Sequence, residues 1–324
     1  MQFVFPKNPT MTKLSDETPR STRLSLPDTA DRLVLPPVPM TQRLVHFGFQ
    51  TLGRLFPRTA GRVALRLFCT PLRRARHRRT DALLERAEVF EFMAGRHLLK
   101  GYRWGDPARP AVVLAHGWES RGTALREFVP HLEAGGYQVV AFDAPAHGDS
   151  PGKRTHLPEY AGALESLVGQ LGEPAGIIGH SFGGASALYA LCRPDGTLRV
   201  PKFVLVNSPA EMRWVFDDAR AQLGMPAPVF RHFISGLERL TGIPDVFALD
   251  AAQLRGGLRA TEVLIVHDEL DPVIAFDQAR KNLAQLPNSR LLITRGAGHF
   301  KLLKRPAVRA RIAAFIQTPA HSAV

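Results

Sequence analysis

The sequence predicts an α/β fold in which a mostly parallel central sheet is flanked by helices and carries a helical cap insertion. Short runs such as PAVVLAHG and AGIIGHS are apolar throughout, which is typical of strands that are buried on both faces of a parallel sheet. Strand and helix patterns alternate along residues 87–318, as they do in sheets covered by helices. Residues 209–259 separate two of these strands and are rich in large apolar side chains, which favours a helical cap over a structureless loop.

The individual elements follow from hydrophobic pattern and from the glycines and prolines that bound each run. Strands are expected at 88–93, 97–104, 110–117, 137–143, 175–181, 202–208, 261–268 and 289–294, and helices at 121–134, 157–171, 182–192, 275–286 and 306–315. The first two strands are expected to be joined through Ala94-Gly95-Arg96.

The front of the chain differs in composition from this body. Residues 1–40 are rich in Pro, Thr and Ser and are expected to be mostly disordered. Residues 41–86 form a basic extension that is expected to be partly helical. Up to Arg86 there are 16 Lys and Arg against 6 Asp and Glu, so this part holds +10 of the net charge of +13.

The extension has two interpretations. Residues 41–79 contain 10 Arg and no acidic residue, and Leu44, Phe47 and Leu52 recur at roughly helical spacing. One or two helices packed on the main domain, with solvated arginines, are the preferred interpretation because such helices are common without lipid or nucleic acid. The alternative is peripheral contact of residues 41–79 with an anionic membrane. Nucleic acid is not expected as a partner, since no recognisable nucleic-acid fold accompanies the arginines.

Cysteine usage and the absence of targeting signals favour the cytoplasm. Cys69 and Cys192 are the only two cysteines, which is too few for a disulfide framework. No stretch approaches the apolar length of a transmembrane helix, and the first residues lack the order of a secretory signal. No cluster has the ligand spacing of a zinc or calcium site, so neither a metal nor a cofactor is expected.

The segment GHSFG, residues 179–183, matches the spacing Gly-x-Ser-x-Gly. Its context strengthens the match, because Ser181 follows a predicted strand and precedes a predicted helix. A sharp turn between them would lift the serine hydroxyl into a cleft, with small residues at Gly179 and Gly183 letting strand and helix approach. We therefore predict that Ser181 is a nucleophile.

Four motifs in chain order give the body a wider resemblance. They are AHGW at 115–118, FDAPAHGDSPG at 142–152, GHSFGG at 179–184, and HDELDPV at 267–273 together with GAGHF at 296–300. With these motifs the body, about residues 88–318, resembles the α/β-hydrolase family, in particular its simple esterase-like serine hydrolases. The front 85 or so residues lie outside the resemblance.

The resemblance implies a Ser-Asp-His triad in the order nucleophile, acid, base. Of the histidines after Ser181, only His299 follows the last predicted strand in a glycine loop, and it is the expected base. Alignment with the family places the acid at Asp271, just before Pro-Val, while Asp268 in the same loop stays an alternative. The family's oxyanion hole would be formed by the backbone N–H groups of Phe182 and Trp118.

Further residues are assigned to the surroundings of the site. His147 and Asp149 are expected to brace a loop near the active-site mouth, in preference to forming a second catalytic pair or a metal site. The substrate pocket is expected to include five side chains of the cap and of the loop that bears the acid: Trp214, Phe216, Phe230, Phe233 and Val273.

The predicted activity is hydrolysis of a small-molecule carboxylic ester or related acyl substrate through an acyl-enzyme. Thioesterase, acyltransferase and aminopeptidase or amidase activities would use the same triad and stay open. A non-catalytic binding protein that uses the basic front end for membranes or nucleic acid is the alternative from a different class. The sequence leaves the identity of the acyl group, the oligomeric state and the pathway open.

Overall fold

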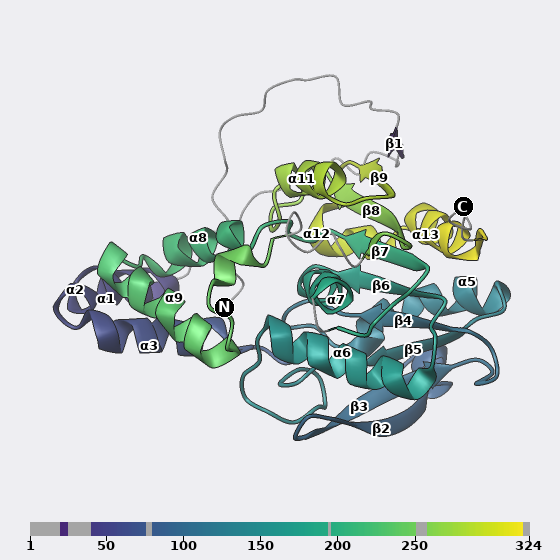
Figure 1. The fold of residues 1–324 in the computed structure, drawn as a ribbon, viewed down its shortest axis with the longest axis horizontal. Coiled ribbons are helices and arrows are strands. Elements are labelled where there is room, and N and C mark those ends of the chain that lie inside the picture. Colours follow the sequence, from purple (N-terminus) through teal and green to yellow (C-terminus); the bar gives the residue numbers. More distant parts are fainter. Residues whose placement is uncertain (1–19, 25–39, 76–79, 194–195, 251–257, 320–324) are drawn as a thin grey trace.

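The computed structural model describes residues 20–24, 40–75, 80–193, 196–250 and 258–319. A central sheet carries helices on both faces. Five helices gather at one end of the molecule (Figure 1): α1 (Met40–Gln50), α2 (Leu52–Leu55), α3 (Pro57–Phe68), α8 (Met212–Leu223) and α9 (Ala227–Thr241). This arrangement confirms the predicted fold class.

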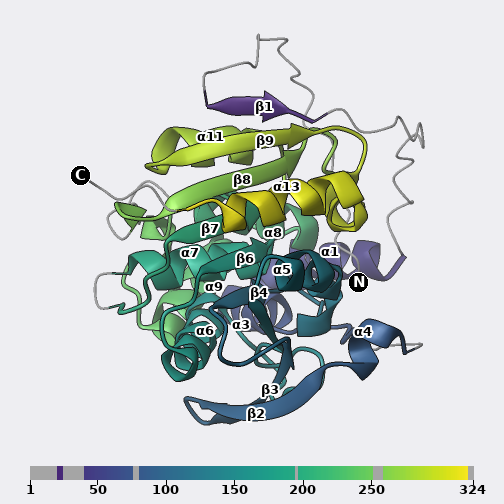
Figure 2. The ribbon, with the colours of Figure 1, turned by 90° about the vertical axis from the view of Figure 1, so that its right-hand side faces the viewer.

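Among the described residues, nine strands form one sheet in the order β1-β9-β8-β7-β6-β4-β5-β3-β2. Figure 2 shows this order across the sheet, with β1 at one edge and the β2-β3 hairpin at the other. Neighbours from β1 to β5 along this order are parallel, whereas β3 runs antiparallel to both β5 and β2. The strands are β1 (Ser21–Arg23), β2 (Glu88–Ala94), β3 (His97–Trp104), β4 (Ala111–Ala115), β5 (Gln138–Phe142), β6 (Gly176–His180), β7 (Lys202–Val206), β8 (Glu262–Asp268) and β9 (Ser289–Thr294).

Helices cover the two faces of the sheet and build two separate cores. Leu164 of α6 and Leu191 of α7 pack on one face, while Leu132 of α5 and Ile312 of α13 pack on the other. The helices are α1 (Met40–Gln50), α2 (Leu52–Leu55), α3 (Pro57–Phe68), α4 (Ala82–Glu85), η1 (Gly122–Phe128), α5 (Val129–Ala134), α6 (Leu157–Leu171), α7 (Phe182–Cys192), α8 (Met212–Leu223), α9 (Ala227–Thr241), η2 (Val246–Ala248), α11 (Asp277–Gln285), α12 (Gly298–Lys301), η4 (Leu302–Lys304) and α13 (Pro306–Gln317).

The cap and the N-terminal extension form a third core. Helices α8 and α9 lie between β7 and β8, where the cap insertion was expected, and α3 packs along α9. The helices approach closely at Gly61, where a Cβ would lie 2.6 Å from Cβ of His232. Phe68 of α3 packs edge-on against Phe216 and Phe233, with ring centroids 5.9 and 5.3 Å away. The extension is therefore integrated with the cap, as the preferred interpretation expected.

Two local features differ from the sequence-based expectation. The segment 1–40 was expected to be mostly disordered, but Ser21–Arg23 forms β1 and pairs with β9. Residues 1–19 and 25–39 of this segment lie outside the described residues. The helix expected at 121–134 consists of the 3₁₀ helix η1 followed by α5. Pro130 explains the change, because it has no N–H to donate to the preceding turn. The domain boundaries at residues 40, 86 and 318 stay predictions.

Candidate active site

Ser181 lies at the sharp turn between β6 and α7. Its backbone has φ +54° and ψ −122°, a conformation that strains any residue with a Cβ. The turn depends on two glycines, since a Cβ at Gly179 would lie 2.6 Å from Cα of Gly184 and one at Gly183 would lie 2.3 Å from the carbonyl oxygen of His116. This backbone lets strand and helix approach, as the Gly-x-Ser-x-Gly spacing predicts.

Hydrogen bonds from the neighbouring strand hold this turn. The Ser181 N–H donates to the carbonyl of Val206 (2.9 Å), and the Ser208 hydroxyl contacts the carbonyl oxygens of Ser181 (3.0 Å) and Val206 (3.1 Å). Ser208 is 1% exposed. Such partners stabilise a backbone conformation that would otherwise relax. Ser208 was not singled out from the sequence.

His299 and Asp271 meet although they belong to different loops. Nδ1 of His299 lies 2.7 Å from Oδ2 of Asp271, and both side chains are almost fully buried. The second carboxylate oxygen of Asp271, Oδ1, accepts the backbone N–H groups of Val273 (2.7 Å) and Ile274 (3.0 Å). The carboxylate is thus oriented by two backbone donors and presents its free oxygen to the imidazole.

The electrostatics of this pair favour an ionised carboxylate. Burial raises the pKa of Asp271, but the hydrogen bond and the charge of His299 outweigh burial and leave the pKa below its usual value. An ionised Asp271 can accept only, so Nδ1 of His299 carries a proton toward it and Nε2 is available to accept another.

Two further buried side chains hold the backbone of His299. Nε2 of His180 donates to the His299 carbonyl (3.0 Å), and Nδ2 of Asn207 donates to the same carbonyl (3.1 Å). Burial lowers the pKa of His180 to about 3, so this ring is neutral near pH 7. Sequence reasoning missed both residues. The signals that could have found them are their places, His180 inside the GHSFG motif and Asn207 at the end of a buried strand.

Asp268, the alternative acid, has other partners in the structure. Its carboxylate accepts the Thr294 hydroxyl (2.8 Å) and the backbone N–H groups of Leu270 (3.0 Å), Gly296 (3.2 Å) and Ala297 (2.9 Å). These contacts tie the loop after β8 to the loop after β9. Asp268 thereby fixes the two loops that carry Asp271 and His299.

The expected oxyanion donors lie on either side of the serine. Phe182 begins α7 directly after Ser181, and a Cβ at Gly117 would lie 3.2 Å from Cβ of Ser181, so the Gly117–Trp118 backbone passes beside the nucleophile candidate. The rings of Trp118 and Phe182 pack edge-to-face, with centroids 5.1 Å apart. The two residues therefore lie beside Ser181, Phe182 at the start of α7 and Trp118 in the loop after β4.

The loop that follows β5 is held by a buried polar network. The Asp143 carboxylate, which is fully buried, accepts the backbone N–H groups of Gly122 (2.7 Å) and Asp149 (2.8 Å) and the hydroxyl of Tyr102 (2.9 Å). Asp149 in turn pairs with Arg121 (2.7 Å). His147 is buried with its ring 5.1 Å from that of Trp118, and burial lowers its pKa to about 3. These residues brace the loop beside Trp118, and no group of three or more His, Cys, Asp or Glu in the described part of the chain could hold a metal ion.

The five predicted pocket residues occupy two different environments. Phe216 and Phe233 are 2% and 0% exposed and pack against Phe68, so both belong to the core shared by cap and extension. Trp214, Phe230 and Val273 are half-buried. Their contact with a substrate stays a prediction.

Comparison with known proteins identifies the family. Residues 112–312, more than half of the chain, match the model of the Alpha/beta hydrolase family. The chain belongs to the α/β-hydrolase family. Among curated relatives, a pimeloyl-[acyl-carrier protein] methyl ester esterase of Neisseria meningitidis (serogroup B / serotype 15, strain H44/76) is 39% identical over 85 residues, which are 26% of this chain and 32% of the relative. The match thus spans about a third of that relative's length.

Solved structures show the same fold. An esterase of Pyrococcus furiosus, Pf2001, superposes with a TM-score of 0.56 at 20% identity, covering 77% of this chain and 96% of the esterase. A thioesterase domain from the curacin biosynthetic pathway superposes with a TM-score of 0.52 at 18% identity, covering 72% and 99% of the two chains. At these identities the likeness concerns the fold. Within the described residues, no helix combines the length and the apolar character that crossing a bilayer requires.

Proposed function

We propose that this α/β-hydrolase is a serine hydrolase that cleaves small-molecule carboxylic esters through an acyl-enzyme. The observation that carries the proposal is the 2.7 Å contact between Nδ1 of His299 and Oδ2 of Asp271, together with Ser181 on its strained turn. The family match and the esterases among the similar proteins support hydrolysis of an ester.

In the first half of the proposed reaction, Nε2 of His299 accepts the proton of the Ser181 hydroxyl while the oxygen attacks the ester carbonyl. Asp271 keeps the Nδ1 proton in place and stabilises the imidazolium that forms, without taking the proton itself. The backbone N–H groups of Phe182 and Trp118 are proposed to bind the oxyanion of the tetrahedral intermediate. The C–O bond to the alcohol then breaks, and the imidazolium protonates the departing oxygen.

The second half returns the free enzyme. His299 accepts a proton from a water molecule, whose oxygen attacks the acyl carbonyl, and the bond to Ser181 breaks as the serine oxygen takes that proton back. The products are a carboxylic acid and an alcohol.

A fluorophosphonate probe tests the nucleophile directly, because it reacts with an activated serine hydroxyl. We expect the wild type to be labelled and Ser181→Ala to be unlabelled. Ser235→Ala, which removes a half-buried serine of α9, is the matched control and should label like the wild type. An unlabelled wild type would favour the non-catalytic binding protein.

The choice between ester and thioester needs a matched substrate panel, since the triad is common to both. We expect oxygen esters to be hydrolysed, with kcat/KM rising from short to medium acyl chains because the cap is rich in apolar side chains. Thioesters cleaved more than tenfold faster than oxygen esters of the same acyl group would make the chain a thioesterase instead.

A further inference from the structure

Helix α1 presents an apolar stripe on the side opposite to its contact with the protein. Gln42 and Phe49 are buried against the rest of the molecule, whereas Met40, Leu44 and Phe47 are 69%, 63% and 66% exposed. The spacing i, i+4, i+7 places these three side chains in one row along the helix. A surface helix of a water-soluble domain normally has the reverse arrangement.

Three more exposed apolar side chains follow α1 directly in the chain. Leu52, Leu55 and Phe56 are 63%, 71% and 63% exposed. No other large apolar side chain in the described part of the chain exceeds 60% exposure. We call these six residues, Met40, Leu44, Phe47, Leu52, Leu55 and Phe56, the apolar ridge. Exposed apolar side chains gathered in this way indicate an interaction surface.

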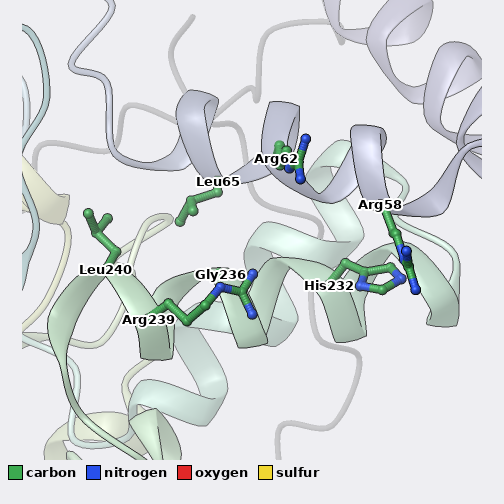
Figure 3. Close-up of a pocket in the computed structure, with 7 residues that line it drawn as sticks. All are labelled: Arg58, Arg62, Leu65, His232, Gly236, Arg239 and Leu240. Carbon is green, nitrogen blue, oxygen red and sulfur yellow. The ribbon is translucent and has the colours of Figure 1, made fainter.

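A basic pocket lies at the same end of the molecule, between α3 and α9. Figure 3 shows Arg58 and Arg62 on α3, and His232 and Arg239 on α9, around a cavity of about 580 Å³. Leu65 and Leu240 complete its lining with Gly236, and no acidic residue takes part.

The three arginines of this pocket are Arg58, Arg62 and Arg239. Among the described residues, none of their guanidinium groups makes an ion pair or a hydrogen bond. Guanidinium groups that line a pocket without a carboxylate in its lining repel one another and favour a bound anion. Their planar donor geometry suits the oxygens of a phosphate.

We propose that the apolar ridge and the basic pocket together dock this protein on an anionic lipid surface. The ridge would insert among the acyl chains near the interface, and the pocket would hold the phosphate of a lipid headgroup. Apolar side chains combined with arginines are the composition that interfacial helices use, because burial of apolar area and attraction to anionic lipid add to each other.

Other occupants fit these observations less well. A nucleic acid would use the arginines and could stack bases on Phe47 and Phe56, but it would gain nothing from Met40, Leu44, Leu52 and Leu55, the four ridge side chains without a planar ring. A second copy of this face would bring two sets of unpaired arginines together at a cost in repulsion. An anionic bilayer satisfies both the charge and the apolar ridge.

The test is co-sedimentation of the full chain with vesicles of phosphatidylcholine alone or mixed with phosphatidylglycerol. We expect binding to the anionic vesicles, weaker binding as salt is raised, and little binding to phosphatidylcholine alone. Arg58→Gln, Arg62→Gln and Arg239→Gln combined should weaken binding about 100-fold at low ionic strength, since each basic residue near an anionic surface contributes about a fivefold factor. Phe47→Ser with Leu55→Ser should weaken it at least tenfold, because less apolar area is buried.

Matched variants on other surfaces separate docking from general effects of charge or folding. Arg96→Gln, Arg259→Gln and Arg311→Gln combined remove the same charge from exposed positions elsewhere, and Val89→Ser with Met93→Ser removes apolar side chains that are 56% and 54% exposed on β2. Both controls should bind vesicles within threefold of the wild type, and all variants should show wild-type thermal unfolding. Equal binding to neutral and anionic vesicles, equal losses in variants and controls, or retention of the chain by DNA but not by vesicles would each overturn the proposal. Fluorophosphonate labelling is unaffected by these outcomes, so failure here leaves the proposed activity standing.

Discussion

Replacing Asp271 by asparagine alters the proposed catalytic histidine through a hydrogen bond whose direction the structure specifies. Oδ1 of Asp271 accepts two backbone N–H groups, from Val273 and Ile274, while Oδ2 faces Nδ1 of His299. An asparagine has one acceptor and one donor end, and the two backbone donors require the acceptor at the Oδ1 position. The amide NH₂ therefore faces His299. The imidazole must then place its proton on Nε2, where it can no longer accept the proton of Ser181.

The magnitude follows from the cost of turning the amide over. The flipped amide would offer a donor to the N–H groups of Val273 and Ile274, leaving two buried donors unpaired at about 1–3 kcal/mol each. A total of about 2–6 kcal/mol corresponds to a productive population between roughly 3 × 10⁻² and 4 × 10⁻⁵, since 1.36 kcal/mol is one factor of ten. We expect kcat/KM of Asp271→Asn to fall by at least about 30-fold and, with the lost charge included, by about 10³–10⁴-fold.

The assay is hydrolysis of a p-nitrophenyl ester over pH 6–10, with the rate of fluorophosphonate labelling as a second readout. Asp268→Asn is the matched control. The Asp268 carboxylate accepts hydrogen bonds from backbone and hydroxyl groups of the same two loops, whereas the carboxylate that contacts the His299 ring is that of Asp271. It should lower the melting temperature while keeping more activity than Asp271→Asn. If Asp271→Asn kept a tenth or more of the wild-type activity while Asp268→Asn abolished it, the assignment of the acid would have to be reversed.

Three further predictions concern pH, positioning and packing. Burial raises the pKa of Asp218 to about 7 from an ordinary value of 3.8. Between these two pH values the folded state keeps the proton that the unfolded state has lost. The contribution of this carboxyl to the free energy of unfolding should therefore fall as pH rises from about 4 to 8. Thermal unfolding of Asp218→Asn should therefore depend less on pH than that of the wild type; equal slopes would contradict the shift. Asn207→Asp keeps the acceptor for the Asp268 N–H but loses the donor to the His299 carbonyl, so kcat should fall at least tenfold with KM within threefold, whereas a rise in KM alone would point to a binding role. Gly61→Ala forces a Cβ to within 2.6 Å of His232 and should cost about 1–3 kcal/mol in urea unfolding, while Gly48→Ala, with nothing within 4 Å, should be neutral or stabilising; similar losses in both would refute the packing argument.

The fold could be predicted because its signals are local in the sequence. The strand Ala111–Ala115, for example, is apolar at every position and lies between Pro110 and Gly117. The sequence pattern alone therefore predicts both this strand and its burial. The strand β1 shows the limit of such reasoning. Its three residues, Ser21–Arg23, have no apolar pattern and are ordered by hydrogen bonds to β9, more than 260 residues later in the chain.

For the candidate site, the sequence predicts those residues that lie in local motifs, and their roles stay predictions. Ser181, Asp271 and His299 each lie in a motif with its own local pattern, and the structure brings His299 and Asp271 into contact. The roles of His180 and Asn207 were missed, because each acts on the backbone carbonyl of a residue about a hundred positions away. Their places in the GHSFG motif and at a strand end mark the two residues, but nothing local in the sequence identifies the carbonyl that they hold. Such a contact becomes visible only when the strands are assembled.

The packing of the N-terminal extension determines how a deletion experiment on it can be interpreted. Deleting residues 1–80 would seem the direct way to ask whether the arginine-rich segment binds lipid. Yet Phe49 and Ala64 are buried in the core shared with the cap, and that core includes Ala185 of α7, one turn from Ser181. The deletion would expose this apolar surface, and exposed cores bind vesicles non-specifically.

The deletion would also reach the proposed oxyanion loop. The carboxylate of Glu119, next to Trp118 and at φ +55°, accepts the backbone N–H groups of Leu72 (2.9 Å) and Arg73 (3.2 Å). Without these donors, the loop beside Ser181 loses the contact that opposes its strained backbone. A truncated chain that lost activity and gained vesicle binding would therefore imitate both proposals through one structural defect. Exposed side chains such as Phe47 and Leu55 can be changed without disturbing the core shared with the cap or the hydrogen bonds of Glu119. For this reason the lipid-docking proposal has to be tested with point variants.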